Sequence, residues 1–235
     1  MISVERVYTS VKDISNKEQK GFITPVVFNT FAHMAQMNIY NELFSDLAEA
    51  KKLSKQGLDP SFQSSFKKQS YDDLSVFVDE FGVTASPTAL PDDFNKIISI
   101  YDNSYNYCDI EYDIRKKPLI LTSHLSGGTT SHPVCFLSDG FIEIYNNSDN
   151  VTNPGFTAAN YTMTYYRTPV RPYYTYVSFN NNNYVVEQFD PNNSVNFELP
   201  AKYENELIAE ILKLIGVRLR DNMVLQFGST EELVQ

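Results

Sequence analysis

One long run of helical periodicity constrains what this chain can fold into more than any other feature. Thr24-Pro25 predicts a helix start, because a threonine hydroxyl caps free N–H groups and proline suits the first helical position. Apolar residues then recur at helical spacing: Phe28, Phe31, Ala35, Ile39, Leu43 and Leu47. The pattern predicts a helix of about 25 residues ending near Leu53, roughly twice the average length in globular proteins. Such a helix is typical of a bundle or a shaft rather than of a compact α/β enzyme.

A second well-delimited helix is predicted near the end of the chain. Pro200 suits a first helical turn, Glu204 and Glu206 place negative charge near the positive helix end, and Gly216 predicts the C-terminal cap. Its apolar residues recur at helical spacing: Tyr203, Leu207, Ile211, Leu214 and Ile215. We expect this helix to dock on the long one and to carry no chemistry.

Two shorter helices and a polar arm complete the expected N-terminal part. One helix is opened by Ser3 and carries Val4, Val7, Val11 and Ile14 at helical spacing. Another is capped by Ser70, and we expect Leu74, Phe77, Val78 and Phe81 to face inward. Between the helices, residues 54–69 predict a long loop or mobile arm. Its candidate partner-binding residues are Phe62, Phe66, Lys67 and Lys68.

The middle of the chain is predicted to be a twisted antiparallel sheet. Alternating apolar segments and β-branched or aromatic residues mark the strands: 96–101, 107–114, 134–137, 141–145, 161–166, 173–179 and 184–189. Asp139-Gly140 is a hairpin signal, and the four asparagines at 180–183 predict a second hairpin.

The order of helices, strands and helix indicates an α+β fold. We expect a helical bundle, made by the long N-terminal helix and the C-terminal helix, with an inserted antiparallel β region. The predicted boundaries are 1–87 for the N-terminal helical part, 88–195 for the β-rich region and 196–235 for the helices completing the bundle.

Composition narrows the classes of partner and compartment. The net charge of −10 disfavours nonspecific nucleic-acid binding through a basic surface, although it is compatible with DNA that passes without sticking. No apolar stretch approaches the length of a membrane span, and residues 1–6 lack the pattern of a signal peptide. Cys108 and Cys135 cannot make a disulfide framework. We therefore expect a soluble protein made in a reducing cytoplasm.

Acidic clusters in the chain favour structural roles over catalytic ones. Asp72-Asp73 and Asp92-Asp93 each follow a helix-start signal, so we expect them to stabilise helix dipoles rather than to bind a divalent metal. Asp109, Glu111 and Asp113 alternate, which predicts one solvated face of a strand rather than a two-carboxylate site.

Candidate zinc ligands and a glycine-rich loop also lack a supporting pattern. Cys108, His124, His132 and Cys135 contain suitable donor atoms, but their spacing matches no compact zinc motif. The loop at 126–130 lacks the Lys-Ser/Thr ending of a phosphate-binding P-loop, so a flexible hairpin tip is the better account. We predict no catalytic, cofactor-binding or metal site, and no enzyme.

A tyrosine-rich stretch is the main candidate for binding. Aromatic strands can stack on sugars or bases, but tyrosine and arginine together are also typical of protein interfaces. We favour subunit contacts, with these interface residues: Tyr165, Tyr166, Arg167, Arg171, Tyr173, Tyr174 and Tyr176.

Short motifs spread along most of the chain resemble one family of virion proteins. They are residues 1–8, residues 16–25 leading into Phe28, residues 90–94, residues 169–172, and residues 197–200 followed by Tyr203, Glu206-Leu207 and 215–217. Through these motifs the chain resembles the head-to-tail connector proteins, also called tail-tube adaptors, of short-tailed bacteriophages, especially the crAss-like group. It departs from them in the asparagine-rich loops and the middle sheet.

The resemblance implies a structural subunit of the virion neck, made and assembled in the bacterial host cytoplasm. Roughly twelve copies would form a ring through heterologous contacts. The implied partners are the portal protein, neighbouring tail or ring proteins and passing double-stranded DNA during ejection, with no membrane and no small-molecule substrate. Two alternatives remain: a carbohydrate-binding tail or fibre module, with exposed tyrosines beside acidic residues, and a metal-dependent hydrolase.

Overall fold

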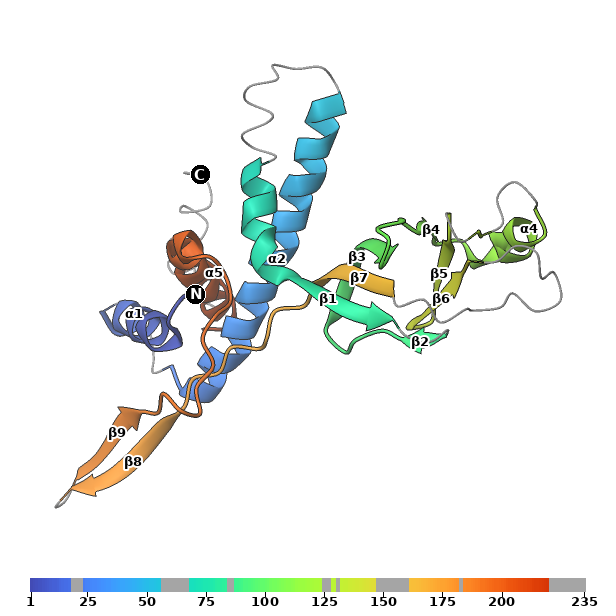
Figure 1. The fold of residues 1–235 in the computed structure, drawn as a ribbon. Coiled ribbons are helices and arrows are strands. Elements are labelled where there is room, and N and C mark those ends of the chain that lie inside the picture. Colours follow the sequence, from blue (N-terminus) through green and yellow to red (C-terminus); the bar gives the residue numbers. More distant parts are fainter. Residues whose placement is uncertain are drawn as a thin grey trace. The chain divides into compact units, whose positions relative to one another are not determined.

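The computed structural model describes residues 1–17, 23–55, 68–83, 87–123, 128–129, 132–146, 161–181 and 184–219. The chain has the expected α+β fold, with helices and several small sheets (Figure 1). It divides into a helical unit, Met1–Val76 with Pro169–Gln235, and a sheet unit, Phe77–Thr168. The sheet unit therefore begins and ends earlier than the predicted β-rich region of 88–195.

The two predicted N-terminal helices are confirmed. Helix α1 spans Val4–Lys17 and helix α2 spans Pro25–Lys55. Their apolar faces are buried as the periodicity requires, with Val7 and Phe28 fully covered. Two side chains cap α1: the Ser3 hydroxyl accepts from the Arg6 N–H at 3.4 Å, and the Asn196 side-chain oxygen, far along the chain, accepts from the Val4 N–H at 3.0 Å. The Asn196 cap ties the start of the chain to its last third.

The predicted C-terminal helix is also present. Helix α5 spans Glu204–Leu219 after a short 3-10 helix, Ala201–Tyr203, and it packs against α1 and α2. Its apolar face is buried at Leu207, Ile211, Leu212 and Ile215. The predicted cap at Gly216 is wrong, because the helix continues through this buried glycine to Leu219.

The helix predicted after Ser70 ends earlier than its apolar spacing suggested. Residues 68–74 are helical, Ser75–Phe77 form a 3-10 helix, and strand β1 follows at Val78–Val83. Leu74 and Phe77 are fully buried as expected. The helical placement of the next residues is wrong, because Val78 pairs with Tyr166 on a neighbouring strand. Valine and phenylalanine favour strands where a pairing partner is available.

Within the described residues the strands form three sheets instead of the single predicted sheet. The sheets have the strand orders β1-β7-β3, β2-β6-β5-β4 and β8-β9. The remaining strands are β2 (Thr88–Ala89), β3 (Phe94–Asp102), β4 (Asp109–Glu111), β5 (Val134–Ser138), β6 (Phe141–Tyr145), β7 (Tyr161–Arg167), β8 (Tyr176–Asn181) and β9 (Tyr184–Phe189). Prolines 169 and 172 separate β7 from β8, because a proline cannot donate to a strand ladder.

One strand pair departs from the predicted antiparallel pattern. Strand β4 runs parallel to β5. Parallel neighbours need a crossover connection, and here helix α4 (Lys117–Leu121) and the 3-10 helix Ile114–Lys116 lie between them in sequence. The β5–β6 hairpin is confirmed, with positive φ angles of 45° at Asp139 and 78° at Gly140.

The two larger sheets share the core of the sheet unit. Its buried side chains come from β1, β3, β5, β6 and β7, together with Cys108: Val83, Ile97, Ile100, Cys108, Cys135, Ile142, Ile144, Tyr161, Met163 and Tyr165. Gly128 shows how closely the connecting segment packs, since a Cβ there would lie 2.0 Å from the Tyr145 carbonyl oxygen.

Candidate interaction surfaces

An extended segment, residues 169–175, is fixed to α2 inside the helical unit. Gln36 lies in the middle of α2 and is fully buried. Its side-chain nitrogen donates to the Val170 carbonyl at 2.9 Å, and its oxygen accepts from the Glu198 N–H at 3.3 Å. The Glu198 carboxylate in turn accepts from the Val170 N–H at 2.7 Å. One helical side chain thus holds two segments that are distant in sequence.

Asn29 repeats this arrangement two turns earlier on α2. Its amide donates to the Tyr174 carbonyl at 2.9 Å and accepts from the Tyr174 N–H at 2.8 Å. Residues seven apart lie on one face of a helix, so Asn29 and Gln36 both face the extended segment. We call Asn29, Gln36 and residues 169–175 the clamp.

An aromatic cluster supports the end of the clamp. The Tyr174 ring stacks on Tyr8 of α1 at 4.1 Å between centroids and on Phe189 of β9 at 5.5 Å. The Tyr8 ring also contacts Phe28 edge to face at 5.1 Å. Burial, together with the nearby Tyr174 and Glu187, raises the pKa of Tyr8 to about 12, so its hydroxyl stays neutral. The base of the β8–β9 hairpin is therefore anchored to two helices.

The β8–β9 hairpin itself exposes apolar side chains. Tyr176, Val177 and Phe179 are 36%, 40% and 52% exposed. Neighbouring strand residues point to opposite faces, so Tyr176 lies on one face while Val177 and Phe179 lie on the other. The hairpin is a two-stranded sheet of its own (Figure 1). Two-stranded hairpins are marginally stable in water, which makes this pair a candidate contact surface.

The predicted interface residues fall into two groups. Tyr165 and Tyr166 are only 4% and 8% exposed in the sheet unit, and Arg167 ends strand β7. The rings of Tyr165 and Tyr166 are therefore buried within the chain itself. The other four lie together on the clamp and the start of β8: Arg171, Tyr173, Tyr174 and Tyr176. Arg171, Tyr173 and Tyr176 are exposed, so a subunit contact at these residues stays a prediction.

The predicted partner-binding arm lies almost entirely outside the described residues. Phe62, Phe66 and Lys67 are not among them, whereas Lys68 is exposed at the start of the helix over 68–74.

A surface that sequence reasoning missed lies at the end of β3. Tyr105 and Tyr107 are 77% and 68% exposed, and the Tyr101 ring lies 5.9 Å and 6.2 Å from theirs. The Tyr101 hydroxyl donates to Glu80 at 3.4 Å. We call Tyr101, Tyr105, Tyr107 and the turn that carries them the tyrosine turn. Its signal in the sequence is a run of turn-forming residues, Asp102-Asn103-Ser104, between tyrosines.

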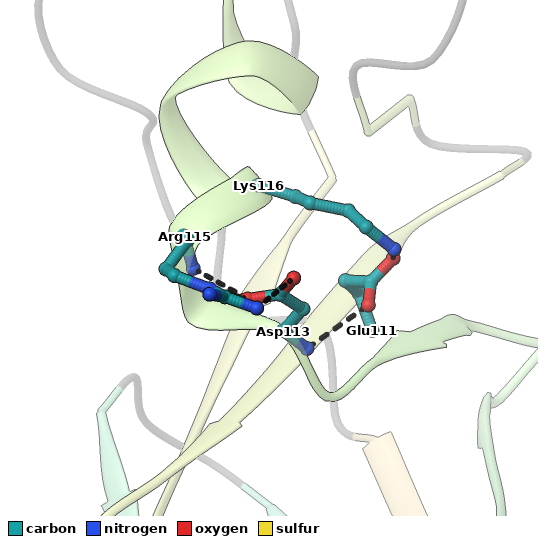
Figure 2. A network of polar contacts seen from close by, with 4 residues as sticks. All are labelled: Glu111, Asp113, Arg115 and Lys116. Atoms are coloured by element: carbon teal, nitrogen blue, oxygen red, sulfur yellow. Dashed lines mark hydrogen bonds and ion pairs between the residues drawn. The ribbon is translucent and has the colours of Figure 1, made fainter.

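Glu111, at the end of β4, and Asp113, just after it, are paired with basic side chains, as Figure 2 shows. Asp113 accepts two hydrogen bonds from the Arg115 guanidinium at 2.8 Å and 3.1 Å, and Glu111 accepts one from Lys116 at 3.0 Å. Asp113 also caps the following 3-10 helix, so the prediction that it shares a strand face with Asp109 is wrong.

These ion pairs make proton transfer by the two carboxylates unfavourable. The Arg115 side chain lowers the pKa of Asp113. The Asp113 backbone N–H and then Lys116 lower the pKa of Glu111. A general acid needs a raised pKa, so this network is suited to fixing the β4–α4 connection rather than to catalysis.

Asp73 and Asp93 bind tertiary partners instead of capping helices. Asp73 accepts from Lys202 Nζ at 2.7 Å and from the Tyr203 hydroxyl at 2.8 Å. Asp93 precedes a strand and accepts from the Tyr165 hydroxyl at 3.0 Å. The predicted helix-dipole role is wrong for both, because Asp73 lies in the last turn of the helix over 68–74 and Asp93 lies in a turn before β3.

The two cysteines lie in the core of the sheet unit. Burial raises the pKa of Cys108 to about 12 and also raises that of Cys135, so both thiols stay protonated. His124 lies outside the described residues. Across the parts of the chain that the structure describes, no three His, Cys, Asp or Glu side chains gather as metal ligands.

No described helix combines the length and the apolar character that crossing a membrane requires. Comparison with protein-family models gives no match, and comparison with curated proteins gives none either. A function is therefore inferred from the clamp, the β8–β9 hairpin and the tyrosine turn.

Proposed function

We propose that this chain is a structural subunit of a ring in the neck of a short-tailed, crAss-like bacteriophage. The ring lies between the portal and the tail and forms part of the channel for DNA ejection. Its subunits are joined by contacts between copies, roughly twelve in number if the ring follows the usual portal symmetry. The chain has no catalytic role in this proposal.

The exposed β8–β9 hairpin is the observation that carries the proposal. Three apolar side chains on its two faces, Tyr176, Val177 and Phe179, are at least 36% exposed. Burying such side chains stabilises an assembly by about 25 cal/mol per Å² of apolar surface. A neighbouring subunit that covers both faces would supply the packing partner that an isolated two-stranded hairpin lacks.

The clamp supports an assembly role because it gives the hairpin a rigid base. Asn29 and Gln36 hold the approach to β8 through three hydrogen bonds to backbone groups of Val170 and Tyr174. A contact element that is already ordered loses less conformational entropy when it binds. Helices α1, α2 and α5 form the bundle that carries this base, with α2 as its shaft.

The charge of the chain suits a channel through which DNA slides. A net charge of −10 per copy, repeated around a ring, repels phosphates and disfavours sticking. The proposal therefore predicts an acidic lumen. A basic lining of the lumen in an assembled ring would contradict the proposal that the channel repels DNA.

Mass photometry of the purified chain, alone and with the portal protein of the same particle, tests the proposal. We expect rings, either at high concentration or upon the portal. The double variant Val177→Ser, Phe179→Ser should weaken ring formation while leaving the helical content of the chain unchanged. Leu119→Ala, at a 72% exposed site in the sheet unit, is the control. A chain that stays monomeric with every neighbouring virion protein would overturn the proposal.

One observation favours the carbohydrate-binding alternative. The tyrosine turn places exposed rings beside Glu80, Asp102 and Asp109, which is the arrangement that this alternative requires. Measurable affinity for a glycan that is lost in Tyr105→Ala would support it. Glycan binding together with a permanently monomeric chain would replace the ring proposal.

A further inference from the structure

We propose that the tyrosine turn of one copy inserts into an apolar recess at the opposite end of β3 in a second copy. The inference rests on the proposed ring and adds the contact that sets its register. Both surfaces belong to the sheet unit, and they face different partners. The resulting interface is heterologous, as a closed ring requires.

The inserting surface is held rigid by Asp102. One carboxylate oxygen accepts the N–H groups of Ser104 and Asn106 at 2.8 Å and 2.9 Å, and the other accepts the Asn106 side chain at 2.9 Å. The Asp102 N–H also donates to the Asn106 carbonyl at 3.1 Å, and the Tyr105 N–H donates to the Asp102 carbonyl at 2.9 Å. The turn is thus formed before any partner binds.

Tyr105 occupies a backbone conformation that a tyrosine rarely adopts. Its φ angle is 62°, in the left-handed region where glycine and asparagine are preferred. An ordinary side chain there costs about 1–2 kcal/mol. Nothing within the chain recovers this cost through burial, because the side chain is 77% exposed. Strain of this kind, combined with an exposed aromatic ring, indicates a binding role.

The receiving surface is a recess of about 330 Å³ between the start of β3 and the β5–β6 hairpin. Its apolar lining includes Leu90, Phe94, Ile97, Tyr112 and Leu137. This volume lies at the small end of the roughly 300–1,000 Å³ of ligand pockets, which suits one aromatic side chain better than a large ligand.

The polar lining of the recess matches the chemistry of a tyrosine turn. Lys96, Ser138 and Asp139 also line the recess. A tyrosine offers an apolar ring and a polar hydroxyl, so it fits a recess lined by both apolar and polar side chains. Lys96 also supplies a positive charge for the acidic turn around Asp102, although Asp139 offsets part of it.

The positions of the two surfaces favour a second copy of this chain as the occupant. The recess involves Phe94–Ile97, whereas the tyrosine turn follows Asp102, so they lie at the two ends of one strand. A nine-residue strand separates its ends by roughly 25 Å. Each copy can therefore insert its turn into one neighbour and receive the turn of another neighbour at the opposite end of β3.

A glycan is the weaker candidate for the tyrosine turn. Both carboxylate oxygens of Asp102 already accept hydrogen bonds within the turn, and Glu80 accepts one from Tyr101. The Tyr101 and Tyr105 rings also stack on each other, with an angle of 18° between them. The faces that the two rings turn toward each other are therefore less open to a sugar, and part of the acceptor capacity of Asp102 and Glu80 is already used.

Complementary variants give a direct test. Tyr105→Ala removes the inserting ring, and Ser138→Trp fills the recess. Each should weaken self-association of the chain at least about tenfold in analytical ultracentrifugation, as expected for a central aromatic contact. An equal mixture of the two variants retains one intact pair of surfaces, so this contact should form between unlike copies and the mixture should associate more strongly than either variant alone. Leu119→Ala should associate like the wild type.

A second inserting-surface variant separates docking from folding. Tyr105→Asn suits the left-handed backbone, so it should raise the thermal midpoint of the sheet unit and still fail to associate. Wild-type association that survives Tyr105→Ala and Ser138→Trp would overturn the inference while leaving the ring proposal intact. A wild-type chain that is monomeric up to about 1 mM would also overturn it. The inference would also be overturned if the chain did not self-associate and instead bound a glycan through Tyr105.

Discussion

Replacing Gln36 by leucine tests the clamp at its centre. Leucine is apolar and similar to glutamine in volume, although its side chain is one bond shorter, so the substitution removes the amide without opening a large cavity. The substitution removes the hydrogen bonds to the Val170 carbonyl and the Glu198 N–H, at 2.9 Å and 3.3 Å. Both backbone groups then lose a partner in a region from which water is partly excluded.

The expected loss follows from the number of hydrogen bonds. Each contributes about 0.5–1.5 kcal/mol net, so Gln36→Leu should lower the unfolding free energy by about 1–3 kcal/mol. With a urea dependence of about 1–3 kcal/mol per M, the midpoint should fall by roughly 1 M. This is a sizeable share of the 5–15 kcal/mol typical of folded domains.

Urea unfolding followed by far-ultraviolet circular dichroism measures this change, because the helices belong to the unit that contains the clamp. Asn38→Leu is the matched control. Asn38 is exposed on the same helix, and its amide donates to Glu210 at 2.7 Å. We expect its effect to stay within about 0.5 kcal/mol, as is usual for surface substitutions. If Gln36→Leu unfolds at the wild-type midpoint, the clamp does not hold residues 169–175 as described.

Two further predictions concern the sheet unit. Gly128→Ala should cost about 1–3 kcal/mol in urea unfolding, because its Cβ would lie 2.0 Å from the Tyr145 carbonyl oxygen. Gly82→Ala meets nothing within 4 Å and is the control, so equal losses would refute this packing. Burial, followed by the hydrogen bond to Asp93, raises the pKa of Tyr165 from 10.0 to about 12. Because the unfolded chain ionises first, stability should fall between pH 10.0 and about 12. Tyr165→Phe should reduce that fall in pH-dependent unfolding, and an unchanged slope would count against the assignment.

The sequence predicts helices well where a periodic apolar stripe is long. Helix α2 follows its stripe from Phe28 to Leu47, and all six residues of that stripe are buried. The stripe is informative because several turns repeat the same signal. The end of α5 was harder to predict, since Gly216 resembles a cap although the helix buries it and continues.

Short apolar segments are ambiguous because helical and strand spacings overlap in them. Leu74, Phe77, Val78 and Phe81 fit one helical face, yet only the first lies in the helix over 68–74. Pairing with β7, which is far along the chain, decides the conformation of Val78–Val83. That partner is not visible in the local sequence.

The candidate surfaces were only partly predictable. The tyrosine- and arginine-rich stretch led to the clamp, but Tyr165 and Tyr166 are buried because β7 is the central strand of its sheet. Gln36 could have been noticed as a polar residue beside the buried stripe of α2. Its two partners lie more than a hundred residues away, so their identity required the structure.

Hydrogen exchange of β8 in the isolated chain and in the assembled particle tests the central claim most directly. The account predicts fast exchange of the amides of Val177, Ser178 and Phe179 in the free chain, since these residues are exposed in a two-stranded hairpin. It predicts strong protection once neighbouring copies cover the hairpin. Equal exchange rates in the two states would contradict the claim that this hairpin joins subunits.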